Sequence, residues 1–125
     1  MKKRDLEENW PSWVVGYLAG PMTGMPALNK PAFTRAARDL RKRGYTIVNT
    51  FELEHNLRMA TDMQYEDFLR LDIRYGLAPE PTNSIILLKG WLHSRGALAE
   101  LHCAATMGYS AFFYDRPNLY RMDLP

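Results

Sequence analysis

The chain has 125 residues, of which 46% are hydrophobic and 24% are charged, and its formal net charge is +2. This composition predicts a single soluble globular domain over 1–125, because a chain of this length can bury a sizeable core. The weak, scattered positive charge argues against a nucleic-acid partner, the single Cys103 excludes an internal disulfide, and three scattered histidines favour no metal or other cofactor.

The first twelve residues carry charges but no apolar stretch typical of a signal peptide, and we expect them to form a loosely ordered extension. No later apolar run approaches the roughly 20 residues that a membrane-spanning helix needs. These features predict a cytoplasmic protein with no membrane partner.

Short apolar runs alternate with amphipathic segments along the rest of the chain. Thr61 or Asp62 is the expected cap of the second helix, and Gly44 and Gly108 are expected just past the ends of the first and third helices. The predicted elements, in chain order, are a strand at 13–20, a helix at 31–43, a strand at 45–49, a helix at 63–77, a strand at 84–89, a helix at 95–107 and a strand at 110–115.

Alternating strands and helices with short connections predict right-handed βαβ units in an α/β fold. We expect a flavodoxin-like or Rossmann-like three-layer sandwich, with a parallel sheet of four or five strands in the order 2-1-3-4 and helices on both faces. In such sheets, ligands bind at the carboxyl ends of the strands, where the first and third strands diverge. The loops 20–26 (GPMTGMP) and 89–96 (KGWLHSRG) would border that crevice, and their backbone amides and the following helix N-terminus favour an anion such as phosphate.

Two helices each direct a carboxylate away from their polar stripe. Glu100 lies about 130° from the centre of the stripe on its helix. That stripe consists of Arg95, Ala99, His102 and Thr106. Asp72 lies opposite a stripe that consists of Glu66, Asp67, Arg70 and Arg74. An unpaired buried carboxylate costs several kcal/mol. One interpretation is structural: Asp72 pairs with a buried arginine or caps a neighbouring loop, and Glu100 borders solvent at the edge of the sheet. The other interpretation is catalytic: one of the two acids attacks the anomeric carbon of a sugar.

Four segments resemble the nucleoside 2-deoxyribosyltransferase-like superfamily, most closely a group of short, largely uncharacterised members found in phages and prophages. The segments are YLAGPMTG at 17–24, NKPAFTRAARDLRKRGYTIVN at 29–49, LRLDIRYGL at 69–77 and GWLHSRGALAE at 90–100. The resemblance extends over residues 14–114. It implies that Glu100 is the nucleophile that forms a glycosyl-enzyme ester at C1′, that Asp72 contacts the base or assists its departure, and that Tyr17 orients the nucleophile.

The stretch SRGALAE at 94–100 is similar to the SxGxxxE motif of the deoxynucleoside 5′-monophosphate N-glycosidases. This likeness implies that Ser94, Gly96 and nearby loop amides hold a 5′-phosphate, to which Arg95 adds a charge-assisted contact; the alternative for Arg95 is a solvated surface residue. Transferases that act on free nucleosides carry an aspartate in place of the serine. The first loop lacks the arginine of the glycosidases, so binding there would rest on backbone amides and Thr23. The residues expected in this loop are Gly20, Pro21, Met22, Thr23 and Gly24.

Three further residues are candidates for the base pocket. Trp91 and His93 lie in the loop after the third strand, where an aromatic ring can stack on a base, although a Trp in such a loop more often packs against the next helix. Relatives complete the pocket from a neighbouring subunit with residues after the fourth strand, and Asn118 is the matching candidate. We therefore expect a homodimer or a higher homo-oligomer.

These observations predict an enzyme that cleaves the N-glycosidic bond of a nucleotide, or transfers its deoxyribosyl group, through a glycosyl-enzyme intermediate on Glu100. The expected partner is a small-molecule nucleotide or nucleoside, with a 5′-monophosphate preferred. The alternative is a non-catalytic nucleotide-binding or sensing module that uses the same crevice. The enzymatic hypothesis requires Asp72 and Glu100 to converge on one place.

Overall fold

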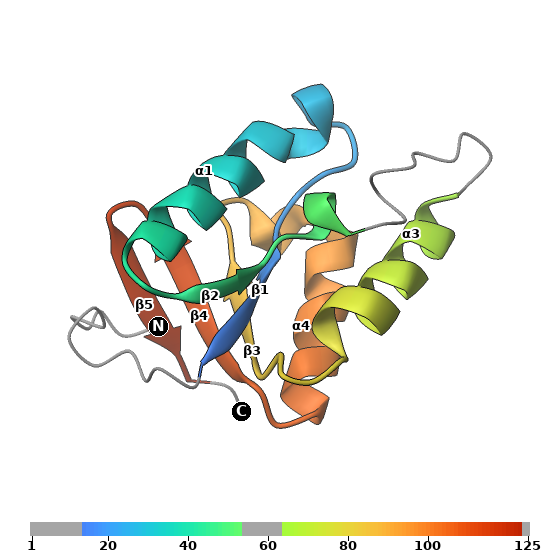
Figure 1. The fold of residues 1–125 in the computed structure, drawn as a ribbon. Coiled ribbons are helices and arrows are strands. Elements are labelled where there is room, and N and C mark those ends of the chain that lie inside the picture. The colour runs from blue at the N-terminus through green and yellow to red at the C-terminus, as the bar shows by residue number, and fades with distance from the viewer. Residues whose placement is uncertain (1–13, 54–63, 124–125) are drawn as a thin grey trace.

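The computed structural model describes residues 14–53 and 64–123, and it has a five-stranded sheet in the order β2-β1-β3-β4-β5. Helix α1 covers one face of this sheet, and helices α3 and α4 cover the other (Figure 1). The predicted α/β sandwich with a flavodoxin-like layout is therefore confirmed. The N-terminal extension and the cap expected at Thr61 or Asp62 lie outside the described residues.

The sheet is mostly parallel. β1 (Val15–Ala19) lies between β2 (Thr46–Val48) and β3 (Ser84–Leu87), and β4 (Ser110–Asp115) continues the parallel set beyond β3. The fifth strand, β5 (Asn118–Met122), pairs antiparallel with β4 through a tight hairpin. β1 and β3 are buried along their whole length, as the continuous apolar runs of a sheet covered on both faces require.

On the first face, α1 (Lys30–Lys42) follows the short 3-10 turn η1 (Pro26–Asn29) and buries its apolar stripe against the sheet. Phe33 and Leu40 are almost fully buried, and the Phe33 ring lies edge-on to Phe51, with 5.1 Å between the ring centroids. Gly44 follows the helix with a φ of +95°, the left-handed conformation that glycine adopts most readily at a helix end.

On the second face, the predicted helix at 63–77 consists of two parts. The α-helix α3 (Tyr65–Asp72) continues into a π-helical turn, η3 (Ile73–Leu77). A π turn shifts the angular position of the residues that follow, because its hydrogen bonds span five residues instead of four. Tyr75, three residues after Asp72, is 52% exposed, whereas Asp72 is 6% exposed.

Helix α4 (Arg95–Thr106) follows the 3-10 turn η4 (Trp91–His93) and packs on the same face as α3. Ala97 and Ala104 are buried against the sheet, and Gly108 lies just past the helix with a φ of +78°. Within the described residues, none of the helices is both long and apolar enough to cross a membrane.

Candidate functional site

Glu100 of α4 and Asp72 at the end of α3 are buried in the same region, beside the phenol of Tyr17 from β1. Each acid is only 6% exposed, and Tyr17 is fully buried. The Tyr17 hydroxyl donates a hydrogen bond to Oε2 of Glu100. Thr50 donates from Oγ1 to Oδ1 of Asp72 over 2.7 Å. Four side chains from four different elements therefore form one buried polar cluster, which we call the Tyr17–Glu100 cluster.

Tyr17 reaches this cluster for two reasons: successive side chains of β1 point to opposite faces of the sheet, and the π turn has a glycine next to the Tyr17 ring. Tyr17 packs with the core on the α4 face, while its neighbour Leu18 packs with the core on the α1 face. A Cβ atom on Gly76 would lie 2.6 Å from Cε1 of Tyr17 and 2.9 Å from Cδ1 of Leu53. Since such contacts are too short for carbon atoms, only glycine at position 76 leaves room for the Tyr17 ring.

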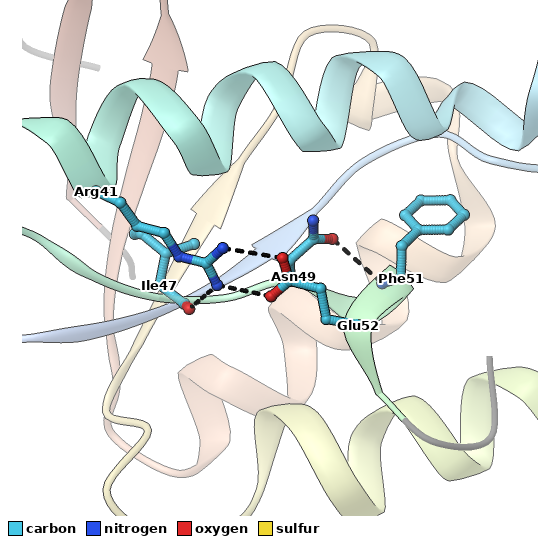
Figure 2. A network of polar contacts seen from close by, with 5 residues as sticks. All are labelled: Arg41, Ile47, Asn49, Phe51 and Glu52. Carbon is cyan, nitrogen blue, oxygen red and sulfur yellow. Dashed lines mark hydrogen bonds and ion pairs between the residues drawn. The ribbon is translucent and has the colours of Figure 1, made fainter. Parts of the chain in front are cut away.

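A network of polar contacts holds the turn that carries Thr50 (Figure 2). Thr50 begins η2 (Thr50–Glu52), and Asn49 caps this turn by accepting from the Phe51 N–H over 3.2 Å. The Arg41 guanidinium, from α1, donates to both carboxylate oxygens of Glu52 over 2.9 and 2.7 Å, and to the Ile47 carbonyl over 2.8 Å. These contacts tie the carboxyl end of β2 to α1, which places Thr50 opposite Asp72.

Burial dominates the electrostatics of the cluster. The pKa of Glu100 is raised from 4.5 to about 8: burial is the largest cause, the hydrogen bond from Tyr17 opposes it, and the neighbouring Asp72 carboxylate adds to the rise. Burial, followed by the charges of Glu100 and Asp72, raises the pKa of Tyr17 well above its ordinary value. Strongly shifted acids that share a specific partner are typical of active sites, although structural networks also contain them.

The N-terminus of α4 lies one turn before Glu100. Ser94 is the N-cap, and its Oγ accepts from the Ala97 N–H over 3.1 Å. A hydroxyl that accepts one hydrogen bond still has its own proton to donate. The Arg95 guanidinium is exposed and lies over the Tyr65 ring, 5.3 Å from its centroid. Gly96 faces the same tyrosine, because a Cβ atom there would be 3.1 Å from the Tyr65 hydroxyl.

The two loops predicted to border the crevice lie against each other. A Cβ atom on Gly90, which has a φ of +90°, would lie 3.1 Å from Cγ of Pro21. In the first loop, Gly20 is buried, Met22 packs partly against the α1-face core, and Thr23 and Gly24 are exposed. The loop is held on its other side by Asn29, whose Nδ2 donates to the Pro21 carbonyl over 2.9 Å.

The base-pocket candidates are more dispersed. Trp91 is half-buried and packs against the core on the α4 face, whereas His93 is exposed. Asn118 begins β5, opposite Asp115, in a hairpin whose Pro117 carbonyl accepts from Arg43 at the end of α1 over 2.8 Å. This hairpin lies at the sheet edge, two strands beyond β3, so one chain alone does not bring Asn118 to Glu100.

Sequence reasoning did not assign roles to three residues beside the acids: Thr50, Tyr65 and Gly76. Thr50 is polar and follows the second strand, whose carboxyl end borders that of β1. A polar residue at this edge of the sheet could have been recognised as a candidate site residue. Tyr65 precedes Asp72 by seven residues, which is two helical turns, so the helical period places both on one face. Gly76 carries no local signal, because its importance depends on where the Tyr17 ring lies.

A separate groove of about 500 Å³ lies along α1. Its lining consists of Thr34, Ala37, Arg38, Arg41, Lys42 and Glu52. Its lining comes mainly from α1, which covers the sheet face opposite to α3 and α4, and the carboxylate among the lining residues, Glu52, pairs with Arg41. It therefore does not coincide with the Tyr17–Glu100 cluster. In the part of the chain that the structure describes, no group of three or more His, Cys, Asp or Glu residues could hold a metal ion.

Comparison with known proteins identifies the family but assigns no activity. A family model described as a domain of unknown function, DUF4406, matches residues 14–113, and the chain therefore belongs to this family. No curated protein and no solved structure matches the chain. The chemical interpretation must then come from the site itself.

Proposed function

We propose that this member of the DUF4406 family cleaves the N-glycosidic bond of a nucleoside 5′-monophosphate, or transfers its deoxyribosyl group to a second base. The observation that carries the proposal is the convergence of Glu100, Asp72 and Tyr17 in one buried cluster. Folding alone does not favour two carboxylates in such a place, because burying each of them costs free energy. In this reaction both acids have a role: Glu100 is the nucleophile, and Asp72 assists the departure of the base.

In the proposed reaction, Glu100 attacks C1′ after losing its proton. The hydrogen bond from Tyr17 to Oε2 stabilises the carboxylate, and Oε1 is the oxygen that forms the ester bond. The C1′–N bond breaks, and its electron pair leaves with the base, which takes up a proton delivered through Asp72. Water then attacks C1′ of the ester, passes a proton to Asp72 and restores the Glu100 carboxylate. If a second base attacks instead, it gives its N–H proton to Asp72 and the sugar is transferred.

The resemblance to the nucleoside 2-deoxyribosyltransferase-like superfamily supports these roles and the phosphate preference. The Ser94 hydroxyl, the first amides of α4 and the Arg95 guanidinium would hold the 5′-phosphate at the positive end of the helix. Gly20 to Gly24 would contribute backbone amides from the adjoining loop. We further propose a homodimer in which the partner subunit brings Asn118 to the base. Size-exclusion chromatography that shows only monomer at high concentration would contradict this assembly.

The decisive experiment is to incubate the protein with a panel of nucleoside and deoxynucleoside 5′-monophosphates and to measure the free base by chromatography. Glu100→Gln should reduce base release by more than about 10³-fold, because it removes the nucleophile. Glu80→Gln is the matched control, since Glu80 is an exposed acid in the loop after η3. Equal release by Glu100→Gln and the original protein would exclude Glu100 as the nucleophile.

The pH dependence of base release provides a second test. Because the pKa of Glu100 is raised to about 8, kcat/KM should increase with pH up to that value and then level off. Tyr17→Phe removes the hydrogen bond that lowers the pKa of Glu100, so its profile should move to higher pH. An unchanged profile in Tyr17→Phe would show that the phenol does not tune the nucleophile.

One observation favours a second candidate function, the recognition of a nucleotide without turnover. A buried Glu100 with a pKa of about 8 is largely neutral at pH 7, and a neutral carboxyl can donate a hydrogen bond to a ribose hydroxyl or a base. Titration calorimetry with the same panel distinguishes the two. Tight binding without any base release would support the sensor and exclude the enzyme.

A further inference from the structure

Among the residues that the structure describes, none bonds to the hydroxyl of Tyr65, at the start of α3. The oxygen is buried. Leaving a buried donor unsatisfied destabilises the folded state, and such groups in a native protein call for an explanation. A ligand atom that accepts from this hydroxyl would remove the penalty on binding.

The position of the hydroxyl indicates which part of a ligand it would meet. It lies 3.1 Å from where a Cβ atom of Gly96 would stand. Gly96 and Glu100 are four residues apart and share one face of α4, with Gly96 nearer the helix N-terminus. The hydroxyl therefore lies beside the first turn of α4, one turn closer to the helix N-terminus than Glu100. A sugar whose C1′ is at Glu100 would extend its 5′ end toward this position.

The charges around Tyr65 suit an anion. The Arg95 guanidinium lies over the phenol ring, and a cation held on an aromatic face keeps a defined position. Burial raises the pKa of Tyr65, opposed by Arg95, so the hydroxyl stays protonated at neutral pH and donates. The first loop, from Gly20 to Gly24, contains no cationic side chain. Arg95 thus supplies a cation beside the first turn of α4 and its neighbouring phenol.

We propose that Tyr65 is a specificity-determining residue that selects a 5′-phosphorylated substrate: its hydroxyl donates to a phosphate oxygen, and its ring holds the Arg95 guanidinium beside the same phosphate. This inference rests on the proposed function, because it assumes that the sugar lies against Glu100. It adds a donor from α3 to the phosphate contacts of α4. It also explains why position 96 is a glycine, since a larger residue would displace the hydroxyl.

The test compares Tyr65→Phe with the original protein on a deoxynucleoside 5′-monophosphate and on the matched free nucleoside. A hydrogen bond to a charged group corresponds to a loss of roughly 10-fold to 100-fold in affinity. We expect KM for the monophosphate to rise about 10-fold or more, with kcat unchanged, and KM for the nucleoside to stay the same. Tyr75→Phe is the matched control, because Tyr75 also carries an arginine on its ring, Arg74, but is exposed.

Titration calorimetry with the same two compounds tests the inference without relying on turnover. Tyr65→Phe should weaken binding of the monophosphate about 10-fold and leave binding of the nucleoside unchanged. If no compound releases base but this difference in binding is observed, the proposed reaction fails and the phosphate contact stands. If Tyr65→Phe affects both compounds equally, or neither, the phosphate contact is overturned. Thermal melting of Tyr65→Phe and Tyr75→Phe serves as a folding control: an unchanged melting temperature excludes unfolding as the cause of weaker binding.

Discussion

The two faces of the sheet differ in the kind of side chain that they bury. On the α1 face, the core consists of apolar and aromatic side chains. Of the ion pairs there, Arg41 with Glu52 is exposed, and Arg43 with Asp39, which also accepts from Tyr114, is partly buried. On the α4 face, the core contains Ile85 and Leu87, yet the buried Tyr17–Glu100 cluster lies directly beside it. The same sheet therefore supports an ordinary core on one side and an electrostatically costly cluster on the other.

This difference shows how a small fold supports a reactive site. Burying apolar groups stabilises the fold, whereas burying a carboxylate raises its pKa and weakens the fold when the group ionises. The apolar α1 face can offset that cost because both faces belong to one cooperative sheet. Variants on the α1 face should then change stability without pH dependence, and variants in the cluster should change it in a way that depends on protonation.

The largest effect should come from Phe33→Ala, on the α1 face. Phe33 is 1% exposed, and truncating a buried phenylalanine typically costs about 3–5 kcal/mol. Urea unfolding at pH 5 and pH 9 should give the same loss, since no titrating group is removed. Leu98→Ala, at a side chain that is 42% exposed on α4, is the control and should change stability by less than about 1 kcal/mol. A strongly pH-dependent loss in Phe33→Ala would contradict the separation of the two faces.

Glu100→Gln should have the next largest effect, and its sign should be opposite. Because the folded pKa of Glu100 is raised from 4.5 to about 8, the unfolded chain releases this proton first as pH increases. Between about pH 5 and pH 8 the original protein should lose up to roughly 1.4 kcal/mol per pH unit from this group, and the loss should level off above the folded pKa. Glutamine cannot titrate, so it should avoid this loss.

Urea unfolding of Glu100→Gln across pH 5 to 9 measures this effect. The variant should lie within about 1 kcal/mol of the original protein near pH 5 and exceed its stability by about 4 kcal/mol at pH 9. Glu80→Gln should follow the original protein throughout. A stability difference that is the same at every pH would mean that Glu100 does not titrate between these limits.

Thr50→Val should cost about 1–3 kcal/mol, because it removes the hydrogen bond to Oδ1 of Asp72 from a fully buried position while keeping the shape of the side chain. Thr50→Ser keeps the hydroxyl and should lose less than half as much. Unfolding by urea at pH 7 compares the two. Equal losses would attribute the effect to the methyl group and not to the hydrogen bond.

Arg41→Met should have the smallest effect, below about 1 kcal/mol, because Arg41 and Glu52 are 40% and 54% exposed. Lys42→Met, at the next exposed cation, is the control. Salt should reduce the difference between the original protein and Arg41→Met, since screening weakens exposed ion pairs. A loss of several kcal/mol would instead show that the network of Figure 2 holds Thr50 in place for the whole cluster.

The layers of the fold and the order of the first four strands could be predicted from the sequence, whereas the antiparallel β5 and part of the site could not. Strand order followed from alternating apolar runs and amphipathic helices, whose patterns are local. The inward placement of Asp72 and Glu100 followed from the helical period, and both are buried. The sequence did not predict the π turn after Asp72, which shifts the angular position of each later residue. Nothing local in the sequence marks that turn.

The sequence by itself determined where the strands and helices lie along the chain, which loops follow the first and third strands, and the direction in which Glu100 points from its helix, because each depends on neighbours within one or two turns. Only the tertiary structure decided that Glu100 accepts from Tyr17, that Thr50 donates to Asp72 and that Tyr65 lies on Gly96. These partners are far apart in the chain: 83 residues separate Tyr17 from Glu100, and 22 residues separate Thr50 from Asp72. They meet because strand pairing and helix packing place them together, and no local pattern encodes such a meeting.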